Sequence, residues 1–264
     1  MNLGLKDKVA IIMASSRGLG KATAIQLAIE GAHIVIGARD IKSLEEAVSE
    51  IKKQSNSKVL FVQTDVTKSE DLNKIANFTL KEFGKIDILV NNAGGPPPGI
   101  FEELTDEQWK QAFELNLMSA VKMIRLVIPS MKQTGSGRII NMTSVAVKQP
   151  IDNLILSNSL RSAVIGMAKT LSKELAPFNI TVNNVATGYF LTDRLRSFYQ
   201  IDEKIKQGKT QAEVLQDLLK DVPMKRLGKP EEFGQLISFL ASEQAAYITG
   251  TTIQIDGGLT KSIL

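Results

Sequence analysis

The architecture follows largely from one segment, Val9-Ala10-Ile11-Ile12-Met13 followed at once by Ala14-Ser15-Ser16-Arg17-Gly18-Leu19-Gly20. The first five residues are apolar and favour a strand that is covered on both faces. The glycines that follow let backbone N–H groups approach a phosphate at the positive end of a helix. An amphipathic run from Lys21 to Glu30 comes next. The segment therefore predicts a strand, a phosphate-binding turn formed by Ser15, Ser16, Arg17, Gly18, Leu19 and Gly20, and a helix.

The same alternation of short β-rich runs and helical periods continues along the chain, which predicts repeated βα units and a parallel sheet. We expect seven strands, at residues 9–14, 33–38, 59–65, 86–93, 138–144, 180–186 and 251–256. We expect helices near residues 18–30, 41–54, 69–83, 106–132, 156–176 and 230–241. The predicted fold is α/β: a single doubly wound Rossmann domain over residues 1–264, with seven mainly parallel strands and helices on both faces.

One long insertion interrupts this alternation, from about residue 192 to 221. It is polar and amphipathic, and we interpret it as a mobile lid over a substrate. The segment Gly95-Pro96-Pro97-Pro98-Gly99 forms a rigid turn, which either walls the substrate pocket or is only a stiff connection.

Composition excludes several classes of protein. The 264 residues contain 43% hydrophobic side chains and a net charge of +4, with Lys and Arg scattered among nearly as many acidic residues, so we expect no nucleic-acid partner. The chain has no cysteine, which excludes disulfides and thiolate metal sites, and we expect no metal. No signal peptide and no apolar run of about 18 residues is evident, so we expect a cytoplasmic protein without a membrane partner.

Charged residues after the second predicted strand bear on a nucleotide cofactor. In dinucleotide-binding folds an acidic residue about 20 residues after the glycine turn holds the ribose 2′-hydroxyl of NAD. Here the sequence is Ala38-Arg39-Asp40, which places a cation in that neighbourhood. Arg39 and Arg17 together suit the 2′-phosphate of NADP, although both can also be solvated surface residues. We therefore expect NADP(H) in preference to NAD(H). Binding of NAD(H) stays open as an alternative if the Asp40 side chain turns inward toward the ribose.

Further motifs fall in a fixed order, namely Asp65-Val66, Asn91-Asn92-Ala93-Gly94, Asn116, Ser144, Asn183-Asn184-Val185-Ala186-Thr187-Gly188, Ile248-Thr249-Gly250 and Asp256-Gly257-Gly258. With the glycine turn they make the chain, from about Lys6 to Gly258, resemble the short-chain dehydrogenases/reductases. It is most similar to the 3-oxoacyl-acyl-carrier-protein reductases, within a subgroup that has an imperfect catalytic tetrad. The resemblance implies an oxidoreductase that assembles as a homodimer or homotetramer through its two long helices and last strand.

The resemblance also implies roles for individual residues. Asp65 would accept a hydrogen bond from the adenine amine, and the Val66 backbone would lie against the ring. Asn92, Ala93 and Gly94 would press against the ribose, and Thr187 and Gly188 would lie beside the nicotinamide. Asn116 would hold a water in the proton relay, or would simply be a buried amide that bonds to the backbone. Two departures concern the cofactor: Ala14 replaces the glycine that opens the family's turn, which is strained if its φ is positive, and Thr187 replaces a proline.

The larger departure lies among the catalytic residues. In the family a Ser polarises the carbonyl, a Tyr thirteen residues later donates the proton, and a Lys four residues further lowers the pKa of that Tyr. Counting from Ser144, Ser157 stands at the Tyr position and Arg161 at the Lys position. A serine hydroxyl is a far weaker acid than a phenol, whose pKa is about 10, and arginine stays protonated. Tyr189 and Lys148 are candidate replacement donors, with loop packing and solvation as their alternatives.

Three functions are compatible with these residues. The first is an NADP(H)-dependent oxidoreductase acting on a small carbonyl, an alcohol or a 3-oxoacyl substrate, and it is the reading we favour. The second is a catalytically silent nucleotide-binding sensor or partner subunit with the same fold. The third is another reaction, such as dehydration or isomerisation, in the same pocket.

Overall fold

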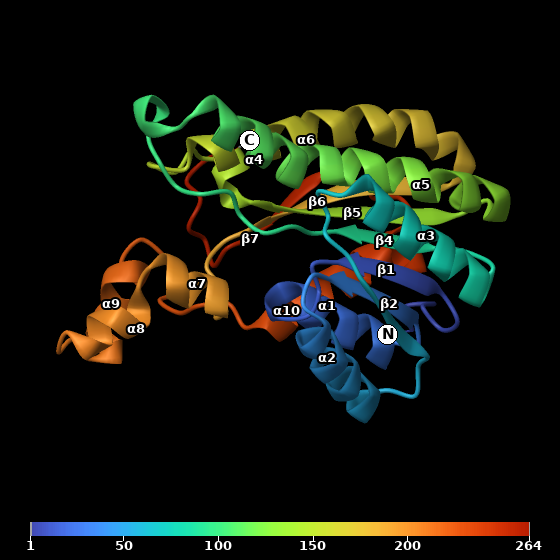
Figure 1. The fold of residues 1–264 in the computed structure, drawn as a ribbon, viewed down its shortest axis with the longest axis horizontal. Coiled ribbons are helices and arrows are strands. Elements are labelled where there is room, and N and C mark those ends of the chain that lie inside the picture. Colours follow the sequence, from blue (N-terminus) through green and yellow to red (C-terminus); the bar gives the residue numbers. More distant parts are fainter. Residues whose placement is uncertain (1, 264) are drawn as a thin grey trace.

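A seven-stranded sheet forms the centre of the computed structural model, which describes residues 2–263 (Figure 1). Its strand order is β3-β2-β1-β4-β5-β6-β7. The strands are β1 (Val9–Met13), β2 (His33–Ala38), β3 (Val59–Gln63), β4 (Ile88–Asn91), β5 (Gly137–Ser144), β6 (Ile180–Thr187) and β7 (Thr252–Ile255). All six pairings between them are parallel, which sharpens the expectation of a mainly parallel sheet.

Helices cover both faces of this sheet, as predicted. On one face α1 (Gly18–Ile29), α2 (Ile41–Gln54) and α10 (Pro230–Ala241) bury their apolar sides against β1 and β2. On the other face α3 (Ser69–Phe83), α5 (Ser119–Thr134) and α6 (Ile155–Leu175) pack against β4, β5 and β6. Figure 1 shows the two layers on opposite sides of the strands. The result is the doubly wound α/β architecture that the sequence predicts.

β1, β3, β4 and β7 are shorter than predicted, and β4 is shortened most. β3 ends at Gln63 instead of residue 65, and β4 spans Ile88–Asn91 instead of residues 86–93. The chain leaves the ladder at these points because its polar groups find other partners. The Asp65 N–H donates to the Asp71 carboxylate at 2.8 Å, and the Ile86 N–H donates to the Ser130 hydroxyl at 2.9 Å.

The predicted helix over residues 106–132 is wrong as one continuous α-helix. The structure contains α4 (Asp106–Phe113), a π-helical turn at Glu114–Met118, and then α5, which runs to Thr134. The wider turn accommodates one extra residue per turn without breaking the helix, and such turns are frequent at functional sites. It places Asn116 on the side of the helix that faces the sheet, where only 7% of the residue is exposed.

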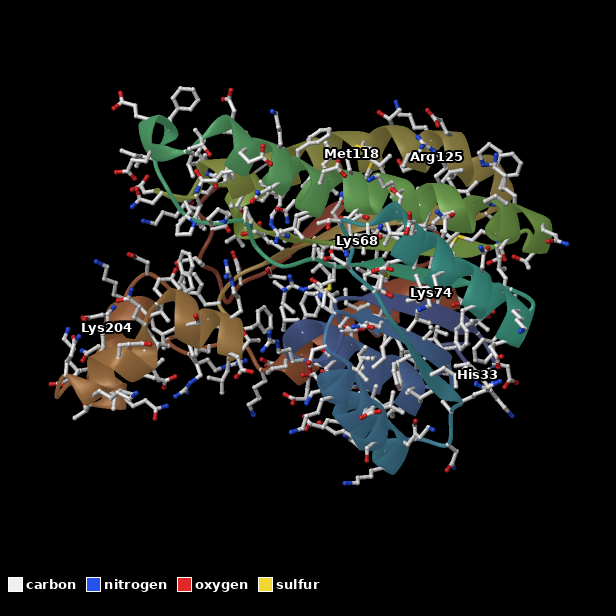
Figure 2. All side chains as sticks on the ribbon, viewed as in Figure 1. His33, Lys68, Lys74, Met118, Arg125 and Lys204 are labelled. Carbon is white, nitrogen blue, oxygen red and sulfur yellow. The ribbon has the colours of Figure 1, made fainter. Side chains whose placement is uncertain are left out.

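The segment 192–221 folds into three short helices, α7 (Asp193–Phe198), α8 (Ile201–Lys206) and α9 (Gln211–Leu219). They share a small apolar cluster built on Leu195, Ile201 and Val214, which is separate from the two main clusters. Figure 1 shows these helices projecting to one side of the sheet. In Figure 2, Lys204 on α8 lies at the opposite end of the molecule from His33. That histidine begins β2 and stacks on Phe83, with 5.5 Å between ring centroids, so it is a strand-end residue.

The strand order reverses between β1 and β4, the point at which open α/β sheets bind their ligands. The loops that follow β1, β4, β5 and β6 meet at this edge. They carry the Ala14–Gly20 turn, the Asn92–Gly94 segment, Ser144 and Thr187 respectively. The topology therefore gathers the predicted cofactor and catalytic residues into one region.

The turn after β1 holds Ala14 at a φ of 47°, in the left-handed region. A non-glycine residue in this region costs roughly 1–2 kcal/mol. The strained turn is held in place by the Asn92 side chain, whose Nδ2 donates to the Ala14 carbonyl at 3.1 Å. The strain anticipated from the missing glycine is therefore present.

We predict that Ala14→Gly raises the free energy of unfolding by about 0.5–1 kcal/mol, because glycine adopts this φ without strain and the relief exceeds its entropic cost. Denaturant unfolding measures the change. Ala163→Gly is a matched control on the exposed side of α6; there the same exchange should lower stability by a similar amount. A loss of stability in both variants would contradict the assignment of strain to Ala14.

Candidate functional site

The glycine turn closes tightly around its own backbone. Ser15 is fully buried, and its N–H donates to the Gly37 carbonyl at 3.1 Å. A Cβ added to Gly20 would lie 2.7 Å from the Ala14 carbonyl oxygen, so only glycine fits there. These contacts fix the path of the chain from β1 into α1.

The amino end of α1 is suited to a diphosphate. The helix starts at Gly18, and the preceding residue, Arg17, provides no side-chain cap. The first N–H groups of a helix have no partner within the helix and form an anion site. The structure places Ser16, Gly18, Leu19 and Gly20 at this amino end, directly after β1.

The residues after β2 favour a cofactor with a phosphate, as in NADP, over one with a hydroxyl group, as in NAD, at the ribose 2′ position. Asp40 caps α2, and its Oδ1 accepts hydrogen bonds from the Ser43 N–H at 2.8 Å and the Ser43 hydroxyl at 2.5 Å. The Ser43 hydrogen bonds, aided by the charges of Lys42 and Arg17, hold the pKa of Asp40 below its usual value. Asp40 is thereby engaged through one oxygen in capping α2. Arg39 and Arg17 place two guanidinium groups in the same neighbourhood, and such a pair suits a 2′-phosphate.

Asp65 keeps one carboxylate oxygen for a ligand. Its Oδ1 accepts hydrogen bonds from the N–H and the hydroxyl of Thr67, at 3.0 and 2.8 Å. Burial acts to raise the pKa of Asp65, but these hydrogen bonds and the Arg39 charge outweigh it and hold the pKa below its usual value. Val66 is 8% exposed and fixes the loop in the core. The arrangement is compatible with an amine bound at Asp65.

A small cavity lies beneath the loop after β4. It has a volume of about 20 Å³, and Ala93, Asn116 and Arg161 are among the residues that line it. The Asn116 Nδ2 donates to the Gly94 carbonyl at 3.0 Å, while the buried Asn116 Oδ1 has no hydrogen-bond partner among the described residues. A buried acceptor without a partner is costly, and a cavity of this volume holds one water molecule. The structure thus gives Asn116 both a backbone partner and an acceptor for a water.

Ser144 is the last residue of β5 and begins the 3₁₀ turn Val145–Val147. Its Oγ accepts a hydrogen bond from the Ala146 N–H at 3.2 Å, so the hydroxyl hydrogen is free to be donated to a ligand. Thr187 lies directly beside it on β6, and the Thr187 hydroxyl donates to the Thr143 carbonyl at 3.0 Å. Gly188 follows, and a Cβ there would lie 2.6 Å from Asp256. Ser144, Thr187 and Gly188 therefore form one rigid wall of the crevice.

Ser157 and Arg161 lie four residues apart on α6, which places them on the same face of the helix. Ser157 is 6% exposed, and its hydroxyl makes no hydrogen bond within the described residues. The Arg161 Nη1 donates to the Met142 carbonyl on β5 at 3.0 Å. Burial, and secondarily the charge of Arg194, lower the pKa of Arg161 to about 10, so it stays protonated at neutral pH.

The two candidate replacement donors differ in their surroundings. Tyr189 packs edge-on against Tyr199, with 5.5 Å between ring centroids, in the cluster of the 192–221 segment. Burial, and secondarily hydrogen bonding to Tyr189, raise the pKa of Tyr199 above its usual value. The packing role of Tyr189 accounts for this geometry. Lys148 ends the turn that Ser144 begins, with its N–H bonded to the Val145 carbonyl at 2.9 Å.

One residue at the site has no sequence signal. Arg194 on α7 reaches across to the loop after β4, where its Nη2 lies 3.5 Å from the Pro96 carbonyl oxygen. It belongs to the insertion, which carries no motif, so only the folded structure reveals its position.

The described residues give no indication of a metal or of a membrane span. Between residues 2 and 263, no group of three or more acidic or histidine side chains is arranged to hold a metal ion. No helix in that range combines the length and apolar character that a membrane crossing requires.

Comparisons with known proteins agree with this geometry. Residues 13–260 match the family model described as enoyl-(acyl carrier protein) reductase. Human dehydrogenase/reductase SDR family member 4 is 35% identical over 255 residues, covering 96% of this chain and 88% of that protein. The 3-oxoacyl-(acyl-carrier-protein) reductase FabG of Staphylococcus epidermidis is 31% identical over 253 residues, covering 96% and 99%.

Among solved structures, L-sorbose reductase from Gluconobacter frateurii, complexed with NADPH and L-sorbose, superimposes with a TM-score of 0.96. The two sequences are 35% identical, and the match covers 100% of both chains. The fold and site define a nucleotide-binding oxidoreductase of the Rossmann type. The chain belongs to the short-chain dehydrogenase/reductase family.

Arg138 is buried and Arg161 is half-buried, and the surroundings of these two arginines differ. Arg138 donates to three backbone carbonyls, those of Gly137, Ser242 and Asn179. Arg161 donates to one carbonyl only, and no carboxylate lies within ion-pair distance of it among residues 2–263. A buried charge without a counter-ion costs stability. Arg161 therefore contributes less to the stability of the fold than Arg138 does.

We predict that Arg161→Met raises the free energy of unfolding by about 1 kcal/mol, because an apolar side chain of similar length removes a half-buried charge that has no counter-ion. Arg138→Met should lower it by about 1–3 kcal/mol, since three carbonyls lose their donor. Denaturant titration of both variants provides the comparison. If Arg161→Met were destabilised as much as Arg138→Met, Arg161 would be a structural residue.

Proposed function

We propose that this protein is an NADP(H)-dependent reductase acting on a small carbonyl or alcohol, with 3-oxoacyl compounds as the leading substrate class. Two findings support NADPH: the pair Arg17 and Arg39 beside Asp40, which caps α2, and a similar structure, L-sorbose reductase, that was solved with NADPH. The α1 amino end would hold the diphosphate, Asp65 and Val66 the adenine, and Asn92, Ala93 and Gly94 a ribose. When bound, the nicotinamide supplies the hydride.

The observation that carries the proposal is the Ser144 hydroxyl, which accepts from Ala146 and so keeps its hydrogen for a substrate carbonyl. A donor fixed in this manner stabilises the charge that develops on the carbonyl oxygen, an effect that typically changes rates about 10²–10³-fold. The rigid β5–β6 wall keeps the hydroxyl in position without reorganisation.

The proton comes from water in this proposal. Ser157 is a weak acid, so it orients a water or the substrate instead of replacing the tyrosine. The Asn116 Oδ1 binds a water in the cavity that Arg161 also lines, and this water supplies the proton to the developing alkoxide. The positive charge of Arg161 stabilises both the alkoxide and the hydroxide left behind. Loss of a dedicated general acid slows such reactions about 10²–10⁴-fold but does not abolish them.

A second candidate function is a catalytically silent nucleotide-binding sensor or partner subunit. The missing tyrosine, at Ser157, is the observation in its favour. A silent protein of this kind needs the cofactor site but has no need of a hydroxyl that polarises a substrate carbonyl. Because the Ser144 hydroxyl is free to donate, the reductase is favoured.

The segment 192–221 completes the site as a lid in this proposal, since α7 begins directly after the β6 loop. Assembly follows the family: a homodimer or homotetramer formed through α4, α5, α6 and β7. Exposed apolar side chains on and next to these elements, among them Phe113, Phe178 and Tyr247, are compatible with such contacts.

We predict that the purified protein oxidises NADPH in the presence of a panel of ketones and 3-oxoacyl thioesters, and that Ser144→Ala lowers kcat/KM at least about 100-fold. Absorbance at 340 nm follows the reaction. NADH should bind at least about tenfold more weakly, because it lacks the phosphate held by two arginines. Turnover that survives in Ser144→Ala would reveal a contaminating enzyme, and absence of turnover across the panel would favour the silent protein.

A further inference from the structure

The first turn of α7 crosses the crevice and touches both of its sides. On one side, the Thr192 Cγ2 lies 3.7 Å from the position of a Cβ built on Gly18, in the turn after β1. On the other side, a Cβ built on Gly95 would lie 2.8 Å from the Arg194 Nη2. Gly95 directly follows Gly94, whose carbonyl holds Asn116. Arg194 therefore lies at the crevice, next to the loop that positions the catalytic asparagine.

The guanidinium of Arg194 is poorly satisfied where it lies. Its one recorded hydrogen bond is the long contact to the Pro96 carbonyl at 3.5 Å, and its Cζ lies 5.7 Å from the Phe198 ring centroid. A guanidinium carries five N–H donors. Within residues 2–263 it forms no ion pair, although it is an exposed residue on a helix that begins with Asp193.

The neighbouring arginine on the same helix shows the contrast. Arg196 forms an ion pair with Asp202 of α8, and hydrogen bonding and the charge of Asp202 raise its pKa. The sequence of the segment thus provides a counter-ion for Arg196 and none for Arg194. Arg194 therefore has a guanidinium that no carboxylate of the described residues neutralises, and an anion at the crevice can pair with it.

The charge of Arg194 also acts on the catalytic residues. It opposes protonation of Arg161 and lowers the pKa of that side chain, although burial is the larger cause. Two arginines that repel one another across a reaction site are stabilised when an anion lies between them. The Pro96-Pro97-Pro98 turn is stiff and keeps the wall opposite Arg194 fixed.

From this arrangement we propose that Arg194 binds a negatively charged group of the substrate, a carboxylate or phosphate carried near the reacting carbonyl. The proposal rests on the proposed reductase function and narrows its substrate class to anionic carbonyl compounds. A diphosphate of the cofactor has the same oxyanion chemistry, so the experiment separates the two sources. Arg194 thereby determines specificity, and Ser144 and Arg161 carry out the reaction.

The test compares keto acids with their methyl esters, for example acetoacetate with methyl acetoacetate, on the wild type, Arg194→Gln and Arg194→Lys. For Arg194→Gln we expect kcat/KM for the acids to fall about 10- to 100-fold through KM, as for loss of a charge-assisted hydrogen bond. The esters should change less than about twofold, and Arg194→Lys should recover part of the loss. Arg196→Gln is the matched control and should leave both substrates unchanged.

Two further readouts do not depend on turnover. Fluorescence titration gives the Kd of NADPH, which should be the same in Arg194→Gln and the wild type. A weaker NADPH Kd, or an equal loss for acids and esters, would overturn the proposal and assign Arg194 to the cofactor or to folding. Calorimetric titration of acid and ester into the protein with NADP⁺ measures binding alone. If the acid binds only when Arg194 is present and the protein shows no turnover, the proposed reductase function is refuted and the anion site is retained. If the protein binds acid and ester equally well, the anion site is refuted.

Discussion

The hydrogen bond from Arg161 to the Met142 carbonyl is the interaction on which the rest of the site depends. It ties α6 to β5 at 3.0 Å, two residues before Ser144, and so sets the distance between the helix that lacks the tyrosine and the strand that presents the serine. A half-buried guanidinium with one backbone partner and no carboxylate contributes little to folding. In the proposed reaction, the positive charge of Arg161 stabilises the negative charge that develops on the substrate oxygen.

The sheet next to Arg161 contains buried polar side chains that are hydrogen-bonded to one another. Asn91, Asn141 and Asn184 form an amide ladder across β4, β5 and β6, with hydrogen bonds of 2.9 and 3.0 Å. Each amide satisfies its neighbour, so the polar layer costs little while it keeps the three strands in register. Asn91 and Asn141 also line the cavity shared with Asn116 and Arg161. This part of the sheet is therefore rigid and polar, whereas α7, α8 and α9 are anchored by a small apolar cluster of their own.

Sequence patterns predicted most of the fold. Strands covered on both faces are continuously apolar, and the glycine turn marks the place where the first strand leads into the first helix. The strain at Ala14 was also predictable, since the preceding strand and following helix leave the chain no other path. The π turn at Asn116 was not: helical periodicity continues on both sides of it, and a mid-helix asparagine is the single hint. Likewise Arg194 lies in a segment without a motif, and its position depends on how α7 folds back over the crevice. The residue-level roles at the site stay predictions.

The most direct measurement is the turnover of NADPH by the wild type and by the double variant Ser157→Tyr with Arg161→Lys, under the same conditions and with the same substrates. If Ser157 and Arg161 belong to a working site, the wild type turns over and the double variant is no faster, because the larger phenol occupies space that water and substrate use. A wild type without activity, together with an active double variant, would contradict this account and identify the protein as a silenced reductase.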